Sequence, residues 1–263
     1  MKKILHVILW PIIFILGQFF IQSLFITSFN SHNVDTYKRL FPSFTDLEII
    51  ETSQYKTDLL NFMNSKVLII TLITFFIFFI LFLILYKPYK KYIINSNITY
   101  KTIILVILSG ILVATFYNNF IYLLNSVIHI TDNYNISDIP LITLIITTGL
   151  LGPILEELLF RGIVYNRVKL YSKYPIIITS VLFALFHFNI VDIIYTFFIS
   201  IILIYLYEKY NTLKISIIFH MIINITSIFI TLILVQNNIL INIFILLISL
   251  FLVPLLLIKL YND

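Results

Sequence analysis

Apolar runs of about 20 residues follow one another along most of this chain, separated by short polar stretches. A helix rises about 1.5 Å per residue, so each run is long enough to cross the hydrocarbon core of a bilayer. Hydrophobic residues make up 60% of the 263 residues and charged residues 11%, which excludes a soluble globular protein. The pattern predicts an all-α, polytopic membrane protein that forms a single membrane domain over residues 1–263.

About eight transmembrane helices account for the apolar runs. They are expected at about residues 4–27, 67–86, 102–128 and 140–160, in two short stretches within 175–207, at 215–235, and in a last stretch that ends at Lys259. The region 175–207 is divided because Asn189 and Asp192 interrupt its apolar character. The one long polar stretch, 28–66, is predicted to be an extracytoplasmic loop.

The positions of Lys and Arg predict the orientation of these helices, because the cytoplasmic loops of membrane proteins carry an excess of both. The segment 87–101 holds four lysines and no acid, whereas the loop with Asp132 and Asp138 holds no cation. We therefore expect a multi-pass protein of the cell membrane with both termini in the cytoplasm. The net charge of +5 reflects this asymmetry, so the lipid bilayer and not a nucleic acid is the expected partner. Cysteine is absent, which excludes thiol nucleophiles and cysteine-type zinc sites.

Two adjacent carboxylates and an arginine lie in the fourth apolar run, where ionisable groups are costly and each needs a partner or a role. Glu157 and Arg161 are four residues apart and share a helix face, so an ion pair that clamps the structure is expected. Glu156 points about 100° away around the helix and lacks that partner. It is either a general base in a poorly hydrated site or a buried acid that bonds a neighbouring helix.

Small residues precede the two glutamates in the same run. Gly149 and Gly152 are expected to allow close helix approach, and Pro153 is expected to kink the helix. A kink there would help to open a path for water.

Three further polar side chains lie in later apolar runs. His187 by itself is compatible with a packing residue as well as with a catalytic one. His220 and Asn224 are four residues apart and share a helix face, where they could bind helices together. If all three sites meet in one cavity with Glu156, they supply a base, an imidazole and two donors for an oxyanion, as hydrolysis of an acyl group by water requires.

These residues form three motifs that resemble the signature of the CPBP (CAAX protease and bacteriocin-processing, Abi) family of intramembrane glutamic proteases. The motifs are Glu156-Glu157-x-x-x-Arg161, Phe183-x-x-x-His187 and His220-x-x-x-Asn224, and the resemblance covers catalytic core helices over residues 140–235. It implies an eight-helix fold in which Glu156 and His187 activate a water, while His220 and Asn224 stabilise the oxyanion. Glu157, Arg161 and Phe183 would support the site. The implied substrate is a membrane-associated peptide or protein.

Two alternatives concern the chemistry. Glu156, His187 and His220 form a possible zinc set, but His-Glu-x-x-His is absent and the glutamate mechanism needs no ion, so we expect neither a metal nor another cofactor. The alternative function is a non-proteolytic bacteriocin-immunity or membrane scaffold protein that uses the same polar cluster for binding. A transporter with a proton relay is a third possibility, although no internal repeat favours it.

Overall fold

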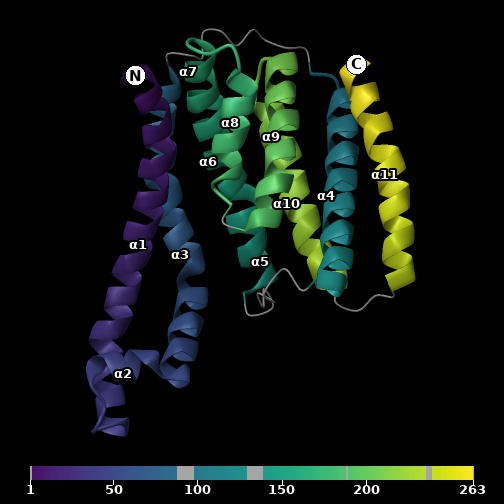
Figure 1. Ribbon diagram of the computed structural model, residues 1–263. Helices are drawn as coiled ribbons and strands as arrows, with labels where there is room; N and C mark the ends of the chain where they lie inside the picture. Colours follow the sequence, from purple (N-terminus) through teal and green to yellow (C-terminus); the bar gives the residue numbers. More distant parts are fainter. Residues whose placement is uncertain (1, 88–97, 129–138, 188, 235–238, 263) are drawn as a thin grey trace.

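A computed structural model describes residues 2–87, 98–128, 139–187, 189–234 and 239–262, and every regular element in these ranges is a helix (Figure 1). The elements in chain order are α1 (Lys2–Leu40), α2 (Asp46–Glu51), α3 (Ser53–Tyr86), α4 (Tyr100–Ile128), α5 (Leu141–Leu144), the π-helix η3 (Ile145–Leu151), α6 (Gly152–Glu157), the π-helix η4 (Leu158–Tyr165), α7 (Asn166–Lys169), α8 (Pro175–Ala184), α9 (Ile190–Tyr210), α10 (Leu213–Leu234) and α11 (Ile239–Asn262). The prediction of an all-α polytopic membrane protein is thereby confirmed.

Seven helices within the described ranges are long and apolar enough to cross a membrane. The fourth of them is composite and runs from Leu141 to Lys169 through α5, η3, α6, η4 and α7. The divided region 175–207 forms α8 and α9, and the side chain of Asn189 caps α9 by accepting the N–H of Val191. However, α8 has ten residues and a length of about 15 Å, half of a hydrocarbon core, so this eighth element is shorter than a regular span.

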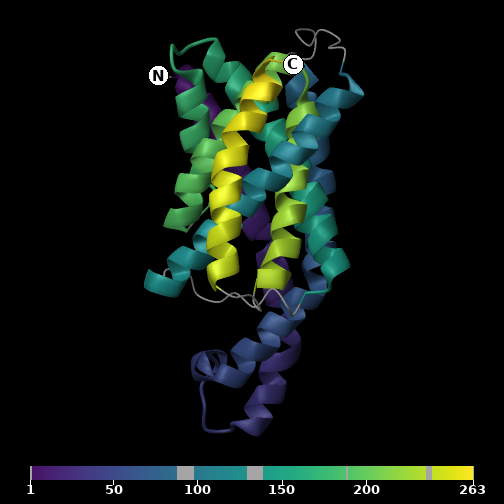
Figure 2. The same cartoon turned by 90° about the vertical axis from the view of Figure 1, so that its right-hand side faces the viewer.

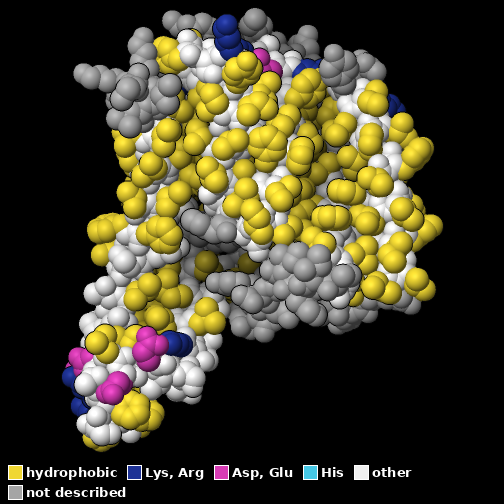
Figure 3. Space-filling view, in the orientation of Figure 1, with side chains coloured by type: hydrophobic (Ala, Val, Ile, Leu, Met, Phe, Trp, Pro, Cys, Tyr) yellow, Lys and Arg dark blue, Asp and Glu magenta, His cyan; other side chains and the backbone are white. Residues whose placement is uncertain are grey.

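The helices form a bundle whose sides carry a broad apolar surface (Figure 3). α1 packs against α3, α4 packs against α10 and α11, and the composite fourth span contacts α3 and α10. The first and last helices begin and end at the same side of the bundle (Figure 1), which agrees with termini that share one side of the membrane. Whether that side is cytoplasmic stays a prediction, because the loops on which it chiefly rests fall at 88–97 and 129–138, outside the described residues.

The segment 28–66 is largely helical and projects beyond the rest of the bundle (Figure 2). α1 and α3 both continue past their apolar runs, and α2 joins them at the tip. A capping box between Thr45 and Glu48 starts α2, and a small core that includes Ile49 and Tyr55 holds the projection together. Its location outside the cytoplasm stays a prediction.

Small residues allow α10 to approach the fourth span and α4 closely. A Cβ atom at Gly149 would lie 2.8 Å from Ile225 Cγ1 on α10, and one at Gly110 would lie 2.9 Å from Ile222 Cγ2 on the same helix. Gly149 therefore has the role expected for it. Gly152 does not, because an added Cβ would meet only atoms of its own span.

Candidate active site

The backbone that carries Glu156 and Glu157 changes between α and π geometry on both sides of them. Pro153 has no N–H to bond the carbonyl of Gly149, and the N–H of Gly152 just before it bonds the carbonyl of Thr147, five residues back. The disturbance expected at Pro153 thus takes the form of a change in hydrogen-bond register. π-helical turns are rare and occur frequently at functional sites.

Glu157 and Arg161 form the ion pair that their spacing predicts, and both side chains are fully buried. Arg161 Nη1 lies 2.8 Å from Glu157 Oε1, while Nη2 donates to the hydroxyl of Ser200 at 3.0 Å and to its carbonyl at 3.3 Å. The guanidinium also lies over the ring of Phe183, 4.5 Å from its centroid. Arg161 therefore ties η4 to α8 and α9.

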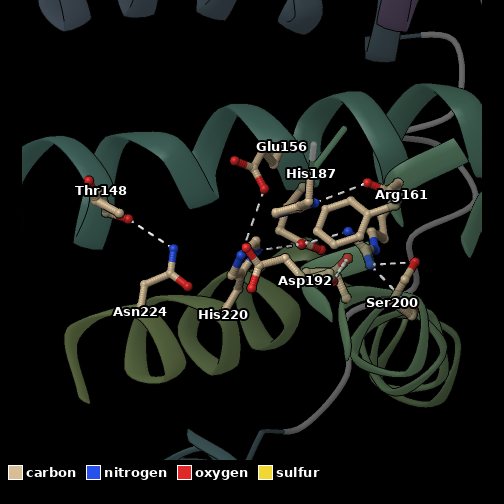
Figure 4. A network of polar contacts seen from close by, with 11 residues as sticks. Thr148, Glu156, Arg161, His187, Asp192, Ser200, His220 and Asn224 are labelled. Carbon is tan, nitrogen blue, oxygen red and sulfur yellow. Dashed lines mark hydrogen bonds and ion pairs between the residues drawn. The ribbon is translucent and has the colours of Figure 1, made fainter. Parts of the chain in front are cut away.

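His220 on α10 contacts both glutamates, and Figure 4 shows its contact with Glu156. Its Nδ1 is 3.0 Å from Glu157 Oε1, and its Nε2 is 3.8 Å from Glu156 Oε2. Because an ionised carboxylate only accepts hydrogen bonds, this geometry assigns a proton to Nδ1 and turns Nε2 toward Glu156. The gap to Glu156 is too long for a direct hydrogen bond, but one water can contact both atoms.

Glu156 and Asn224 line a cavity of about 270 Å³, the size of a small ligand pocket. Asn224 donates one N–H to the carbonyl of Thr148 at 2.9 Å, which fixes the carboxamide and leaves its second N–H available. Glu156 is 26% exposed, whereas its neighbour Glu157 is sealed from solvent. The two adjacent glutamates therefore differ in access to water, as their positions around the helix suggest.

His187 lies beyond the end of α8, in a turn and not within a helix as expected. Its backbone N–H donates a hydrogen bond to the carbonyl of Ala184 at 2.9 Å, and its Nδ1 lies 3.3 Å from the carbonyl oxygen of Phe183. The ring of Phe183 packs against both imidazoles: its centroid lies 5.3 Å from the ring centroid of His187 and 5.9 Å from that of His220. The structure thus brings Glu156, His220 and Asn224 together and links His187 to them through Phe183. The described residues show no direct bond between His187 and Glu156.

The opposite wall of the cavity contains polar residues that a search for ionisable groups does not find. They are Gln18 and Gln22 on α1, and Thr71 and Thr74 on α3. Two uncharged polar residues four apart within an apolar run are a readable signal, because they share one face of the helix. Ser200, which binds Arg161, was missed for the same reason.

The possible zinc set does not match this geometry. Across the described part of the chain, no three His, Asp or Glu side chains are grouped so that they hold a metal ion. That the site works without a metal or another cofactor stays a prediction.

Comparison with known proteins agrees with the motifs. Residues 138–226 match a family model described as type II CAAX prenyl endopeptidase Rce1-like, and no curated protein or solved structure gives a significant match. The matched segment contains all three motifs, so the resemblance to the CPBP family of CAAX-type proteases is confirmed for this third of the chain. The match and the helical fold together support a multi-pass intramembrane protease of the CAAX type.

Proposed function

We propose that the protein hydrolyses a peptide bond of a membrane-associated peptide or protein with a water activated by Glu156. The observation that carries this proposal is the position of the Glu156 carboxylate, which faces a cavity within the apolar bundle and adjoins His220. A general base needs access to water, and it needs a neighbouring polar group that can interact with it in both its charged and its protonated form. The cavity gives Glu156 access to water, and the imidazole of His220 is its neighbouring polar group.

The proposed reaction divides the work among the motif residues. Glu156 takes a proton from water as the water oxygen attacks the scissile carbonyl, and it passes this proton to the leaving amine. Asn224 donates its second N–H to the oxyanion, and His220 donates from Nε2 in the imidazolium form, in which both ring nitrogens carry a proton. His187 shares the proton of Glu156. Catalytic hydrogen bonds often tighten only when substrate is bound, so the indirect link of His187 through Phe183 is compatible with this role.

Comparative peptidomics tests the proposal and identifies the substrate in the same experiment. Membrane peptides are compared between cells that produce the wild-type protein and cells that produce the Glu156→Gln variant. We expect a set of shortened peptides that is present only with the wild-type protein, and their ends would identify the cleaved bond. If the two peptide sets are identical while both proteins are in the membrane, the protein is not a protease of this kind, and a binding role takes its place.

Asn224→Ala is expected to lower kcat by about 10²–10³-fold, because it removes one donor to the oxyanion. The purified variant is assayed in detergent on a synthetic form of a peptide found by peptidomics. Asn118→Ala is the matched control, since Asn118 also joins two helices, with its Nδ2 2.8 Å from Ser227 Oγ, but does not line the cavity. Equal rates for the two variants would contradict the role of Asn224.

Cleavage is expected to continue after thorough chelation, because the proposed reaction uses a carboxylate and not a metal-bound water. The purified wild-type protein is dialysed against EDTA and phenanthroline and is then assayed on the same synthetic peptide. Loss of activity that zinc restores would show that the site works as a metal centre.

A further inference from the structure

The family match does not include all of the chain that lines the cavity. It covers residues 138–226, whereas the wall that faces Glu156 comes from α1 and α3. This wall presents Gln18 and Gln22, one helical turn apart, to the space that Glu156 and Asn224 share. What these two residues contribute is independent of the three motifs.

Both carboxamides are available for a ligand. Among the described residues neither Gln18 nor Gln22 has a hydrogen-bond partner, and the hydroxyls of Thr71 and Thr148 in the same cavity have none. By contrast, the hydroxyl of Thr74 donates to the carbonyl of its own helix at Ile70. An amide group on a membrane-spanning helix needs a polar partner, and for Gln18 and Gln22 the space of the cavity, and not another described residue, has to provide it.

The spacing of the two glutamines matches an extended peptide. Four residues of an α-helix rise by about 6 Å, and alternate residues of an extended chain are separated by about 6.6 Å. A carboxamide can donate to a backbone carbonyl and accept from a backbone N–H at the same time. Gln18 and Gln22 can therefore pair with residues n and n+2 of a peptide that lies along α1.

Such pairing answers a requirement of the proposed reaction. A peptide must be extended before water can reach its scissile bond, and its exposed N–H and C=O groups then need partners that lipid does not offer. We infer that Gln18 and Gln22 are positioning residues that hold the main chain of the substrate extended along α1, opposite Glu156 and Asn224. This inference rests on the proposed function and deepens it.

The lining also indicates the class of peptide. Among the described residues that line the cavity, Glu156 is the one ionisable residue, and the other polar groups are amides and hydroxyls. A carboxylate of the substrate would meet the charge of Glu156 without a cation to compensate it. The segment at the cleavage site should therefore be uncharged or weakly basic, with Asp and Glu depleted on both sides of the cleaved bond.

The test compares four proteins in cells: wild type, Glu156→Gln, the double variant Gln18→Leu with Gln22→Leu, and Gln54→Leu. Leucine is more favourable than glutamine in a membrane helix, so the double variant should insert normally. We expect it to lower the yield of the Glu156-dependent peptides about tenfold for each hydrogen bond lost. Gln54→Leu makes the same chemical change in the projection, where Gln54 contacts Asp58 outside the cavity, and should leave the yield unchanged.

A second measurement separates positioning from a structural effect. A photoreactive benzophenone side chain is placed at position 22 in the Glu156→Gln protein, which holds substrate without cleaving it. Position 20 is the control, because Phe20 is 64% exposed and does not line the cavity. We expect crosslinks to the peptides found by peptidomics from position 22 and not from position 20. Equal crosslinking at both positions, or a double variant with wild-type yield, would overturn the inference and leave the protease intact. If no peptide depends on Glu156, the proposed function itself fails.

Discussion

Glu156→Gln is expected to reduce cleavage by about 10²–10⁴-fold while the variant accumulates in the membrane at the wild-type level. The substitution preserves the size of the side chain and removes its ability to accept a proton. Little stability should be lost, because the one ion-pair contact that Glu156 makes among the described residues, with Nε2 of His220, is 3.8 Å long and partly exposed, unlike the short buried pair of Glu157. Quantitative peptidomics and immunoblots of isolated membranes measure the two effects on the same cells.

Glu157→Gln provides the contrast for this experiment. Glu157 is fully buried and contacts both Arg161 and His220, so its substitution should reduce the amount of folded protein together with the activity. Two neighbouring residues of one type would thus show different defects. A Glu156→Gln protein that still processes its peptides at the wild-type rate would remove the general base from the mechanism.

Arg161→Ala is expected to lower the free energy of unfolding by about 3–5 kcal/mol, because it leaves the carboxylate of Glu157 buried without its partner. The bonds to Ser200 and the stacking on Phe183 are lost as well. Arg161→Lys should restore only part of the stability, since an ammonium is a point charge that cannot make all these contacts together. Unfolding in detergent by heat or denaturant, with membrane abundance as the cellular measure, tests both variants.

Two controls make this prediction specific to the buried pair. Lys169→Ala breaks a surface ion pair of similar length, 2.7 Å to Glu208, and should cost at most about 1 kcal/mol. Replacing both partners, as Glu157→Gln with Arg161→Met, should recover stability relative to Arg161→Ala because no uncompensated charge remains. If Lys169→Ala and Arg161→Ala unfold alike, the pair is not the clamp that its burial suggests.

The membrane fold was predictable because the length of an apolar run is directly related to the thickness of the bilayer. The argument was less precise for 175–207, which was divided into two short stretches: α9 is long enough to span the membrane, whereas α8 ends after ten residues. Helix ends depend on local hydrogen bonds that hydropathy does not report. In the projection, by contrast, the sequence Thr45-x-x-Glu48 is a readable capping box, and attention to it would have predicted α2.

At the site, contacts between residues close in sequence could be predicted from their spacing, whereas contacts between distant segments could not. The pair of Glu157 with Arg161 follows from four residues of separation on one helix. The contact of Glu157 with His220 joins residues 63 apart in sequence, so it required the packing of α10 against α6. Gln18 and Gln22 were missed because they lie outside the three motifs and no Asp, Glu, Lys or Arg accompanies them in the first apolar run.

The paired π-helical stretches on either side of α6 mean that a complete set of motifs does not guarantee an aligned site. A π turn contains one residue more than the corresponding α turn, so conversion of η3 or η4 to regular α geometry would rotate Glu156 about the helix axis relative to α10. Deletion of a single residue within 162–165, the part of η4 that follows the first motif, would leave the sequence of every motif unchanged and still alter the register of the helix that carries the carboxylates. Related chains are therefore best compared by the register of this helix as well as by the identity of their acids and histidines.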